Sequence, residues 1–583
     1  MSETTYWSCR CALIESIDSY DFSAYIGRNF IHYLRAPMDW IEYKQIQNFE
    51  VGITPLFVDY LNDFDKLKDY YAADFRDRNS WKKLIDKVLS KQKNRSTLVR
   101  VLTEQNKLHH CGIRTLANID LLGNENTVAV VTGQQVGICS GPLYTIYKTL
   151  TAIKLAEQLS SQYPDYNFVP VFWVENEDHD FEEINKLNVL NSAGDLQTIE
   201  YLFGGKPFER NPGPVGNIVL DGFIDGFFDR LQAQLQDSEF KAPLFAALRG
   251  HYRSGATFGA AFVGLMNQMF EDSGLVFLNP GNAELKNILK PVFQKEIAGM
   301  SRTSQMVIDT SAGLEEHYHA QIKAKSINLF MIHKGGRYLI EPRENDYSLK
   351  GTRQFFSKEE LNGIVENSPE LISPNVVLRP ICQDAILPTI AYVGGPSEIA
   401  YFAQLKPVYE SFGVQMPVVY PRASATILEE KVKNILEKFQ VGFTEIWSDL
   451  DPLLARIAEQ VSEVKVDALF DQLHTRFHEA VAESRFGIQQ IDPTLSGAID
   501  STLARIDAQL NVLKEKTQSA QQRRQEVTIK QIQKVAANIY PKTNFQEREF
   551  NVVYYMNKYG PDFVKWLSGE IVIDRFQHQL IDL

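Results

Sequence analysis

Two stretches of the sequence combine glycine, amide and ionisable side chains in patterns that could do chemistry. The first, Thr132 to Tyr144, contains three glycines spaced by four residues and two adjacent amides: Gly133, Gly137 and Gly141, with Gln134 and Gln135. Glycines let backbone amides approach an anion, and a helix starting here would add unpaired N–H groups at its positive end. The stretch predicts a nucleotide or acyl-phosphate site. It is not a Walker A loop, and the alternative is a tight connection between two elements.

The second stretch, Glu175 to Ile184, is an acidic cluster around one histidine. His179 lies between Asp178 and Asp180, so a carboxylate could orient it and raise its basicity. A general base toward an attacking amine requires both effects. The carboxylates could instead hold a magnesium ion that bridges nucleotide phosphates. The structural alternative is that Asp180 only caps the next helix.

Charged residues and a second glycine turn follow later in the chain. Arg379 could pair with a carboxylate or phosphate, and Glu398 with an amine. Gly394 and Gly395 form a turn between a predicted strand and a helix, which would give a second opening lined by amides. The alternatives are a surface ion pair for Arg379 and an ordinary first-turn acid for Glu398. Arg422 comes after the last predicted core strand.

An α/β framework is needed to bring these stretches together. Thr127 to Val131 and Phe168 to Val174 are apolar and strand-like, with a helical pattern from Tyr144 to Leu159 between them. Continuous apolar strands around a helix predict a βαβ unit in a parallel sheet covered on both faces. Ligands of such sheets bind beyond the carboxyl ends of the strands, where the acidic cluster falls. The core is predicted to resume in three further apolar runs: Val376 to Leu378, Ile390 to Val393 and Val418 to Tyr420.

The pattern of apolar and polar residues divides the chain into four predicted parts. Residues 1–125 are mainly helical, 126–424 form the α/β core with insertions at about 190–370, 425–543 form a helical arm, and 544–583 pack back on the body. Apolar residues in the arm recur at alternating spacings of four and three, as at a helix-packing seam. Helices folded back at Asp492-Pro493, or meeting a second subunit, explain this better than a plain bundle. The seam residues are Leu428, Val432, Ile435 and Phe439, then Ile499, Leu503, Ile506, Leu510 and Leu513.

Composition limits the location and the partners of the protein. The net charge of −13 and the pI near 5.5 argue against a broad phosphate-binding surface, so we expect no nucleic-acid partner. No basic segment with an apolar stretch opens the chain, and no 18 consecutive apolar residues occur, so we expect a cytoplasmic protein without a membrane contact. The five cysteines fit neither a disulfide framework nor a four-ligand zinc site. For Cys9 and Cys11 we favour two buried thiols over a metal site.

Several long motifs, in this order along the chain, resemble the bacillithiol biosynthesis cysteine-adding enzymes, the BshC family. They are Thr132-Gly-Gln-Gln-x-Gly137 with Gly141-Pro-Leu-Tyr144, Glu177-Asp-His-Asp180 with Glu183-Ile184, Ser373-Pro-Asn-Val-Val-Leu-Arg-Pro380, Gly394-Gly-Pro-x-Glu-Ile-Ala-Tyr401, Gln546-Glu-Arg548 and Lys558-Tyr-Gly-Pro561. The resemblance implies a ligase that joins the carboxyl of cysteine to the amino group of glucosaminyl-malate, with ATP as cosubstrate and Mg²⁺ beside it.

The same resemblance implies an architecture. The family has a Rossmann-like parallel-sheet core similar to class I aminoacyl-tRNA synthetases, connecting-peptide insertions, and a coiled coil that supports homodimers. Gln134, Gln135 and Gly137 stand where the synthetases carry a nucleotide-handling histidine motif, and that histidine is absent here. Adenylation is therefore implied only by analogy.

These patterns together give a set of candidate site residues. The catalytic candidates are His179 as the base, Asp180 and Glu177. The candidates for binding nucleotide and substrates are Gly133, Gln134, Gln135, Gly137, Gly141, Tyr144, Arg379, Gly394, Gly395, Glu398 and Arg422. Two other classes stay open: a metal-dependent hydrolase using Asp178, His179 and Asp180, and a non-catalytic nucleotide-binding assembly partner.

Overall fold

The core of the protein is a parallel sheet of five strands. The computed structural model describes residues 40–46, 53–91, 93–207, 211–344, 346–461 and 464–583, so Cys9 and Cys11 lie outside the described residues. The spatial order of the strands is β13, β12, β2, β3, β6, and every neighbouring pair is parallel. Their bounds are β2 (Thr127–Gln135), β3 (Asn167–Glu175), β6 (Val276–Leu278), β12 (Thr389–Gly394) and β13 (Val418–Pro421).

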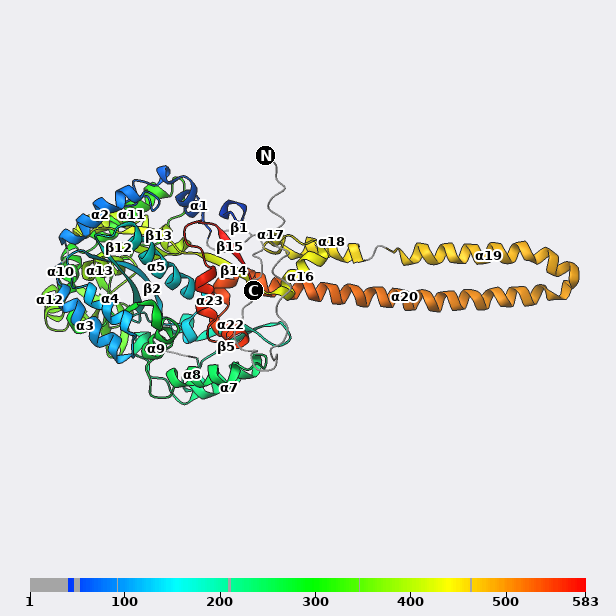
Figure 1. Ribbon diagram of the computed structural model, residues 1–583, viewed down its shortest axis with the longest axis horizontal. Helices are drawn as coiled ribbons and strands as arrows, with labels where there is room; N and C mark the ends of the chain where they lie inside the picture. The colour runs from blue at the N-terminus through cyan, green and yellow to red at the C-terminus, as the bar shows by residue number, and fades with distance from the viewer. Residues whose placement is uncertain (1–39, 47–52, 92, 208–210, 345, 462–463) are drawn as a thin grey trace, which may run out of the picture. The chain divides into compact units, whose positions relative to one another are not determined.

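The predicted βαβ unit is confirmed as β2, α5 (Leu143–Gln162) and β3. Seven consecutive residues of β2 are buried, so both faces of the strand are covered, as in a parallel sheet between helices. α5 contacts β2, β3 and β12, and the sheet also contacts α2 (Arg78–Lys91), α3 (Arg95–Leu108) and α4 (Ile113–Leu121) (Figure 1). The α/β class predicted from the sequence is therefore confirmed.

The order of the strands reverses at β2. Its neighbour β3 follows it directly along the chain, whereas its other neighbour, β12, comes about 250 residues later. Ligands of open α/β sheets bind in the crevice that forms at such a reversal, outside the carboxyl ends of the strands. The region predicted to hold insertions also contributes β6 to the core sheet, and its three residues are too short a run to be recognised in the sequence.

A second, antiparallel sheet of five strands lies in the insertion region. Its order is β10, β9, β8, β7, β11, with bounds β7 (Leu329–His333), β8 (Gly336–Pro342), β9 (Tyr347–Leu349), β10 (Phe355–Phe356) and β11 (Ile372–Pro374). The predicted core strand Val376 to Leu378 is wrong. The Asn375 side chain accepts hydrogen bonds from the Val377 and Leu378 N–H groups, which turns the chain into α13 (Arg379–Ile386).

The segment from Ala425 onward, predicted to be helical, begins as a strand. β14 (Ser424–Leu428) pairs in parallel with β15 (His578–Asp582), and β15 pairs with β1 (Trp40–Ile41), so Leu428 belongs to a sheet and not to a helical seam. The partner strand is 150 residues away, and no local pattern could reveal it. A further two-stranded sheet pairs β4 (Lys186–Leu190) with β5 (Leu196–Glu200).

The two longest helices form an antiparallel hairpin. α19 (Val466–Ile491) and α20 (Ser496–Ile539) contact each other and lie side by side, joined by a turn at Pro493–Leu495 as the sequence predicts (Figure 1). α16 (Glu430–Phe439) and α18 (Leu450–Val461) also contact α20. None of the described helices is long and apolar enough to cross a membrane.

The other helices cover the core or follow it along the chain. They are α1 (Pro55–Asn62), α6 (Phe181–Ile184), α7 (Phe223–Gln234), α8 (Lys241–His251), α9 (Phe258–Met269), α10 (Ala283–Gly299), α11 (Arg302–Leu314), α12 (Lys358–Asn367), α14 (Pro396–Phe402), α15 (Lys406–Phe412), α17 (Phe443–Ile446), α21 (Gln546–Glu549), α22 (Val552–Tyr559) and α23 (Phe563–Glu570).

A buried histidine in β15 predicts a loss of stability in mild acid. His578 lies between the hydroxyls of Ser424 and Thr426, at 2.8 and 2.9 Å, and burial lowers its pKa from 6.5 to about 4. Between these two values the unfolded chain takes up a proton that the folded chain excludes, so the free energy of unfolding falls as the pH falls. We expect a loss of roughly 3 kcal/mol from pH 7 to pH 4, measured by urea unfolding.

A His578→Gln variant isolates this effect, because glutamine does not titrate. All other acid-sensitive groups are common to the two proteins, so the difference between their pH profiles reports His578. Parallel profiles for the parent and the variant would contradict the prediction.

Candidate active site

A cavity of about 770 Å³ lies at the carboxyl ends of β2, β3 and β12, where the strand order reverses. This is the position at which sheets of this kind bind ligands, and the volume is ordinary for a small-molecule site. Of the predicted site residues, the following line it: Gly133, Gln134, Gln135, Tyr144, His179, Arg379, Gly395, Glu398 and Arg422. A second cavity of about 400 Å³ shares several of these residues and adds Gly137 and Gly141.

The two predicted amides make hydrogen bonds at the wall of the cavity. Gln134 Nε2 donates to the Tyr144 hydroxyl at 3.1 Å. Gln135 Nε2 donates to Asp178 and Glu183, both at 2.7 Å, and so joins the end of β2 to the acidic cluster after β3. Gln135 therefore fixes the relative positions of the two predicted stretches, and Gln134 closes the first of them on itself.

Two glycines of this loop are required by close packing of the chain itself. A Cβ atom at position 133 would lie 2.7 Å from the Trp173 carbonyl oxygen, and one at 137 would lie 2.6 Å from the Cα atom of Gly141. Gly141 has a φ of +72°, a conformation that favours glycine. Anion binding by this loop stays a prediction.

Some of the backbone hydrogen-bonding groups at the amino end of α5 already have partners within the chain. The Leu143 N–H donates to the Phe550 carbonyl at 2.8 Å. Asn551 Nδ2 donates to the carbonyl oxygens of Cys139 and Gly141, at 2.9 and 2.7 Å. The C-terminal segment thus covers part of the turn, and fewer N–H groups are free than the sequence predicts.

His179 lies between a carboxylate and a guanidinium. Its Nδ1 lies 3.3 Å from Asp178 Oδ1 and 3.1 Å from Arg337 Nη1, and its ring packs against Phe330. Arg337 can only donate, so its hydrogen bond to Nδ1 corresponds to the tautomer with the proton on Nε2. In the other tautomer Nδ1 donates to Asp178, and the lone pair of Nε2 can then accept a substrate proton. The side chain is 39% exposed, so a ligand in the cavity can reach it.

Asp178, and not Asp180, is the carboxylate beside His179. Burial opposes ionisation of Asp178, but hydrogen bonds from His179 and Gln135, together with the Arg337 charge, hold its pKa well below the usual range. Asp180 instead caps α6 by accepting from the Glu183 N–H at 3.2 Å, which was the structural alternative. Glu177 is buried in an ion pair with Lys286 at 2.6 Å. Neither Asp180 nor Glu177 lines the cavity.

Glu175, at the end of β3, is a second titratable group in the cavity. Burial and the neighbouring acids Glu177 and Asp178 raise the pKa of Glu175 to about 7, against the opposing charges of Arg379 and Arg337. Its Oε2 accepts a hydrogen bond from Trp173 Nε1 at 3.1 Å. A carboxyl group that titrates near neutral pH can serve as a general base or a general acid.

The predicted Glu398 is part of a buried ion pair. Lys148 of α5 donates to Glu398 Oε2 at 2.8 Å and to the Gly133 carbonyl, and Gly395 N–H and Tyr392 OH also donate to Glu398. Burial opposes ionisation, but the Lys148 charge lowers the pKa of Glu398. The pair therefore joins α14 to the end of β2, and it does not leave Glu398 free for a substrate amine.

The two predicted arginines, Arg379 and Arg422, also make hydrogen bonds to other side chains of the protein. Arg379 donates to Gln383 and to the Tyr401 hydroxyl and lies over the Tyr392 ring. Arg422 donates to Glu547 at 2.6 Å, and both side chains are at least 95% buried. Gly394, next to Gly395, is buried within β12 and does not line the cavity.

Arg548, from the C-terminal segment, is a basic residue that both cavities share. Its guanidinium lies 6.0 Å from the Tyr144 ring. It has no carboxylate partner among the residues that the structure describes. The sequence places Arg548 in a C-terminal motif but gives no sign that it reaches the core.

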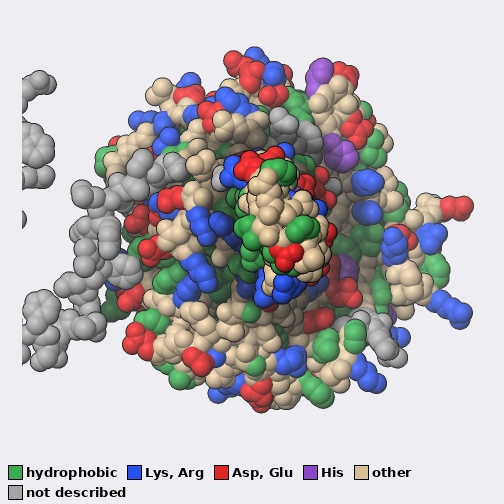
Figure 2. Space-filling model, turned by 90° about the vertical axis from the view of Figure 1, so that its right-hand side faces the viewer, with side chains coloured by type: hydrophobic (Ala, Val, Ile, Leu, Met, Phe, Trp, Pro, Cys, Tyr) green, Lys and Arg blue, Asp and Glu red, His purple; other side chains and the backbone are tan. Residues whose placement is uncertain are grey.

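The larger cavity gathers positive charge in an acidic protein. Seven basic and four acidic side chains line it, and four of the basic ones come from segments predicted only as insertions: Lys323, Lys325, Arg337 and Lys350. Over the face drawn in Figure 2, by contrast, acidic and basic side chains are interspersed. Such a concentration of positive charge favours small anionic ligands.

Sequence reasoning missed Arg337, Lys148 and Arg548, and it gave Glu175 no separate role. Arg337 and Arg548 come from segments far from the core motifs, so local spacing carries no signal for them. Lys148 was detectable as a charge within the apolar first half of α5, a helix that is buried along most of its length.

The proposed zinc set of the hydrolase alternative does not converge. Among the described residues, the one group of three or more possible metal ligands within reach of each other lies in the helical hairpin. Asp178 pairs with His179 and Arg337, while Asp180 caps a helix.

The parallel sheet and its reversal at β2 define a Rossmann-like α/β protein, with a basic cavity where sheets of this kind bind ligands. Residues 41–423 match the family model of the BshC N-terminal Rossmann-like domain, and residues 425–583 match that of the BshC C-terminal coiled-coil domain, both described under bacillithiol biosynthesis. The chain therefore belongs to the BshC family of bacillithiol biosynthesis.

Curated relatives agree with this assignment. Proteins named "Putative cysteine ligase BshC" are 38% identical in Salinibacter ruber, covering 90% of this chain and 96% of the relative, and 34% identical in Chlorobaculum tepidum, covering 91% and 96%. A solved structure of a "putative arginyl t-RNA synthetase" from Campylobacter jejuni covers 78% of this chain and 97% of its own, with 11% identity and a TM-score of 0.19. The fold assignment rests on the sheet and the family models and not on that likeness.

Proposed function

We propose that the protein is a ligase that joins the carboxyl group of cysteine to the amino group of glucosaminyl-malate, the last step of bacillithiol synthesis. The observation that carries this proposal is the basic cavity at the strand reversal, which holds two groups able to move a proton, His179 and Glu175. The family and the names of the relatives supply the substrate class. Malate and a nucleotide are both anions, and both suit the basic lining.

ATP is the proposed source of energy, because a carboxylate resists attack by an amine. Transfer of an adenylyl group from ATP releases pyrophosphate, and transfer of a phosphoryl group releases ADP; either makes a mixed anhydride at the cysteine carboxyl. AMP or phosphate then leaves when the amide bond forms. Arg548 and the lysines at positions 323, 325 and 350 are the cations available to the phosphates, with Mg²⁺ entering on the nucleotide. Gly133, Gln134 and Gln135 would line the nucleotide's side of the cavity.

A base must keep the amine neutral as it attacks the anhydride. His179 is the proposed base, oriented by Asp178 through Nδ1 so that Nε2 takes the proton. Glu175 is the alternative, since its pKa of about 7 gives it both protonation states near neutral pH. We place the reaction in the cytoplasm, and we propose a homodimer formed through the α19–α20 hairpin.

The direct test is mass-spectrometric detection of the condensed product after pure protein is incubated with cysteine, glucosaminyl-malate and Mg-ATP. We expect a product ion whose mass equals the two substrates less one water, formed only with ATP, together with AMP or ADP. Its absence, with nucleotide and amino sugar both bound in a thermal-shift assay, would favour the non-catalytic assembly role. Absence of both product and binding would remove the proposed function.

A further inference from the structure

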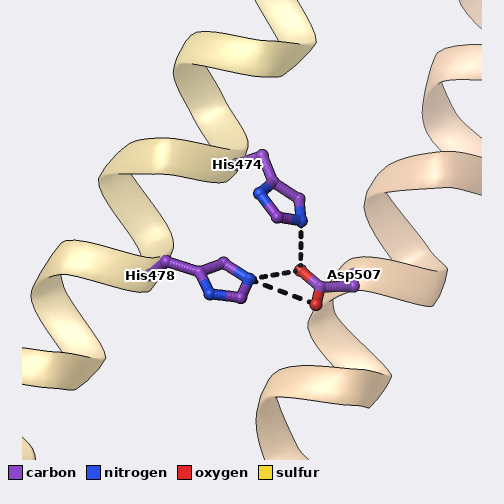
Figure 3. A group of neighbouring side chains, drawn as sticks. All are labelled: His474, His478 and Asp507. Carbon is purple, nitrogen blue, oxygen red and sulfur yellow. Dashed lines mark hydrogen bonds and ion pairs between the residues drawn. The ribbon is translucent and has the colours of Figure 1, made fainter.

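The helical hairpin carries a cluster of three polar side chains that the reaction does not use. His474 and His478 are one helical turn apart on α19, so both project from the same face of that helix. Asp507 faces them from α20 (Figure 3). The cluster therefore joins the two antiparallel helices of the hairpin.

The ligand atoms of this cluster already converge. His474 Nε2 lies 3.0 Å from Asp507 Oδ1, and His478 Nε2 lies 3.0 and 3.1 Å from its two oxygens. The imidazole rings are stacked with their centroids 4.3 Å apart. All three ligand atoms lie within 4.8 Å of one another (Figure 3).

These spacings suit a metal ion. Zinc binds histidine nitrogen and carboxylate oxygen at ~2.0–2.2 Å, which puts the ligands of a tetrahedral site ~3.3 Å apart. Two histidines separated by four residues on a helix are a known way to hold zinc from one side, and two histidines with one carboxylate suit several first-row ions. The nitrogen–oxygen distances of 3.0 and 3.1 Å are close to this spacing, and the two histidine nitrogens lie within 4.8 Å of each other.

We propose that His474, His478 and Asp507 bind a divalent first-row transition-metal ion such as Zn²⁺, which cross-links α19 to α20. The side chains are 49%, 42% and 29% exposed, so an ion can enter from solvent and keep water as its remaining ligand. The proposal is independent of the function proposed for the cavity. It adds a structural metal site to the hairpin.

Few side chains are buried in the middle of the hairpin, so a cross-link there would add to its stability. Among the described residues of α19, the buried ones are Val466 and Phe470, both near its start. In α20, Ile499 is buried near the start and the others lie beyond residue 527. The middle of the hairpin therefore has little apolar burial within one chain, and a bond across it stabilises the pairing of the helices.

The test is metal binding by tag-free, full-length protein. Zn²⁺ is titrated in competition with a chromophoric chelator, and Co²⁺ is used to read the coordination geometry from its visible spectrum. We expect one ion per chain, and an affinity ~10-fold or more lower in His478→Ala and in Asp507→Asn. Saturating Zn²⁺ should also raise the thermal midpoint of the parent but not of the variants.

A matched control removes two exposed histidines elsewhere, His317→Ala with His319→Ala. This pair should leave Zn²⁺ binding unchanged, while His474→Ala with His478→Ala should abolish it. Alanine is a better helix former than histidine, so these variants should keep the hairpin folded, which circular dichroism checks. Failure of the parent to bind, or equal loss of binding in the control, would overturn the proposal.

Discussion

Replacing His179 by alanine is expected to slow amide formation by ~10²–10⁴-fold, the usual contribution of a general base. The side chain lies at the wall of the cavity, with Nδ1 directed to Asp178 and Arg337, so Nε2 is the nitrogen available to a substrate. Because the side chain is 39% exposed, its loss should leave the fold intact. The measurement is the single-turnover rate of product formation with saturating substrates.

The alternative base, Glu175, is separated from His179 by a pH profile. If Glu175 is the base, kcat/KM should rise with pH through about 7, where its carboxyl group loses its proton. This rise of kcat/KM with pH should disappear in Glu175→Gln and persist in His179→Ala. If instead His179→Ala slows the reaction by ~10²-fold or more and Glu175→Gln leaves the pH profile unchanged, His179 is the base.

A nearby acid provides the matched control for both variants. Glu182 lies in the same acidic cluster but is exposed and does not line the cavity. Glu182→Gln should change the rate by less than a factor of about two, as expected for a surface substitution. Losses in Glu182→Gln equal to those in His179→Ala would show that the cluster acts through general charge and not through a base.

The sequence was informative where function depends on neighbouring residues in one βαβ unit. The β2 and β3 strands, the helix between them and the residues at their carboxyl ends follow from apolar runs and glycine spacing, because these signals are local. This is why Gln134, Gln135 and His179 could be placed at one site. The role of Asp180 could not be separated from that of Asp178, since only the turn of the loop decides which carboxylate faces the ring.

The other half of the site was beyond sequence reasoning because it is assembled from distant segments. Arg337 comes from an antiparallel sheet whose strands are short, and Glu547, Arg548 and Asn551 come from the C-terminal part. The hairpin cluster shows the same limit. His474 and His478 can be paired by their spacing, but Asp507 joins them only once the chain has folded back.

Removal of the Glu547 carboxylate is expected to cost ~3–5 kcal/mol of stability, because it leaves a buried arginine without its partner. Glu547 accepts from Arg422 at 2.6 Å, and its other oxygen accepts from Ser424 OH and the Ala425 N–H, both at 3.0 Å. Arg422 also lies over the Tyr144 ring at the cavity wall. The Glu547→Ala variant should show a lower urea midpoint than the parent.

Two further variants test whether the unpaired charge is the cause. Asp582→Ala breaks the exposed ion pair with Lys433 and should cost less than about 1 kcal/mol, as surface pairs do. Arg422→Met combined with Glu547→Leu removes both charges and should recover much of the stability lost in Glu547→Ala, since no charge is left buried. If the double variant is as unstable as Glu547→Ala, the loss comes from packing at α21, and Arg422 does not depend on its carboxylate. Recovery of stability without recovery of product formation would mean that the pair, although dispensable for folding, positions Arg422 and Tyr144 at the cavity wall.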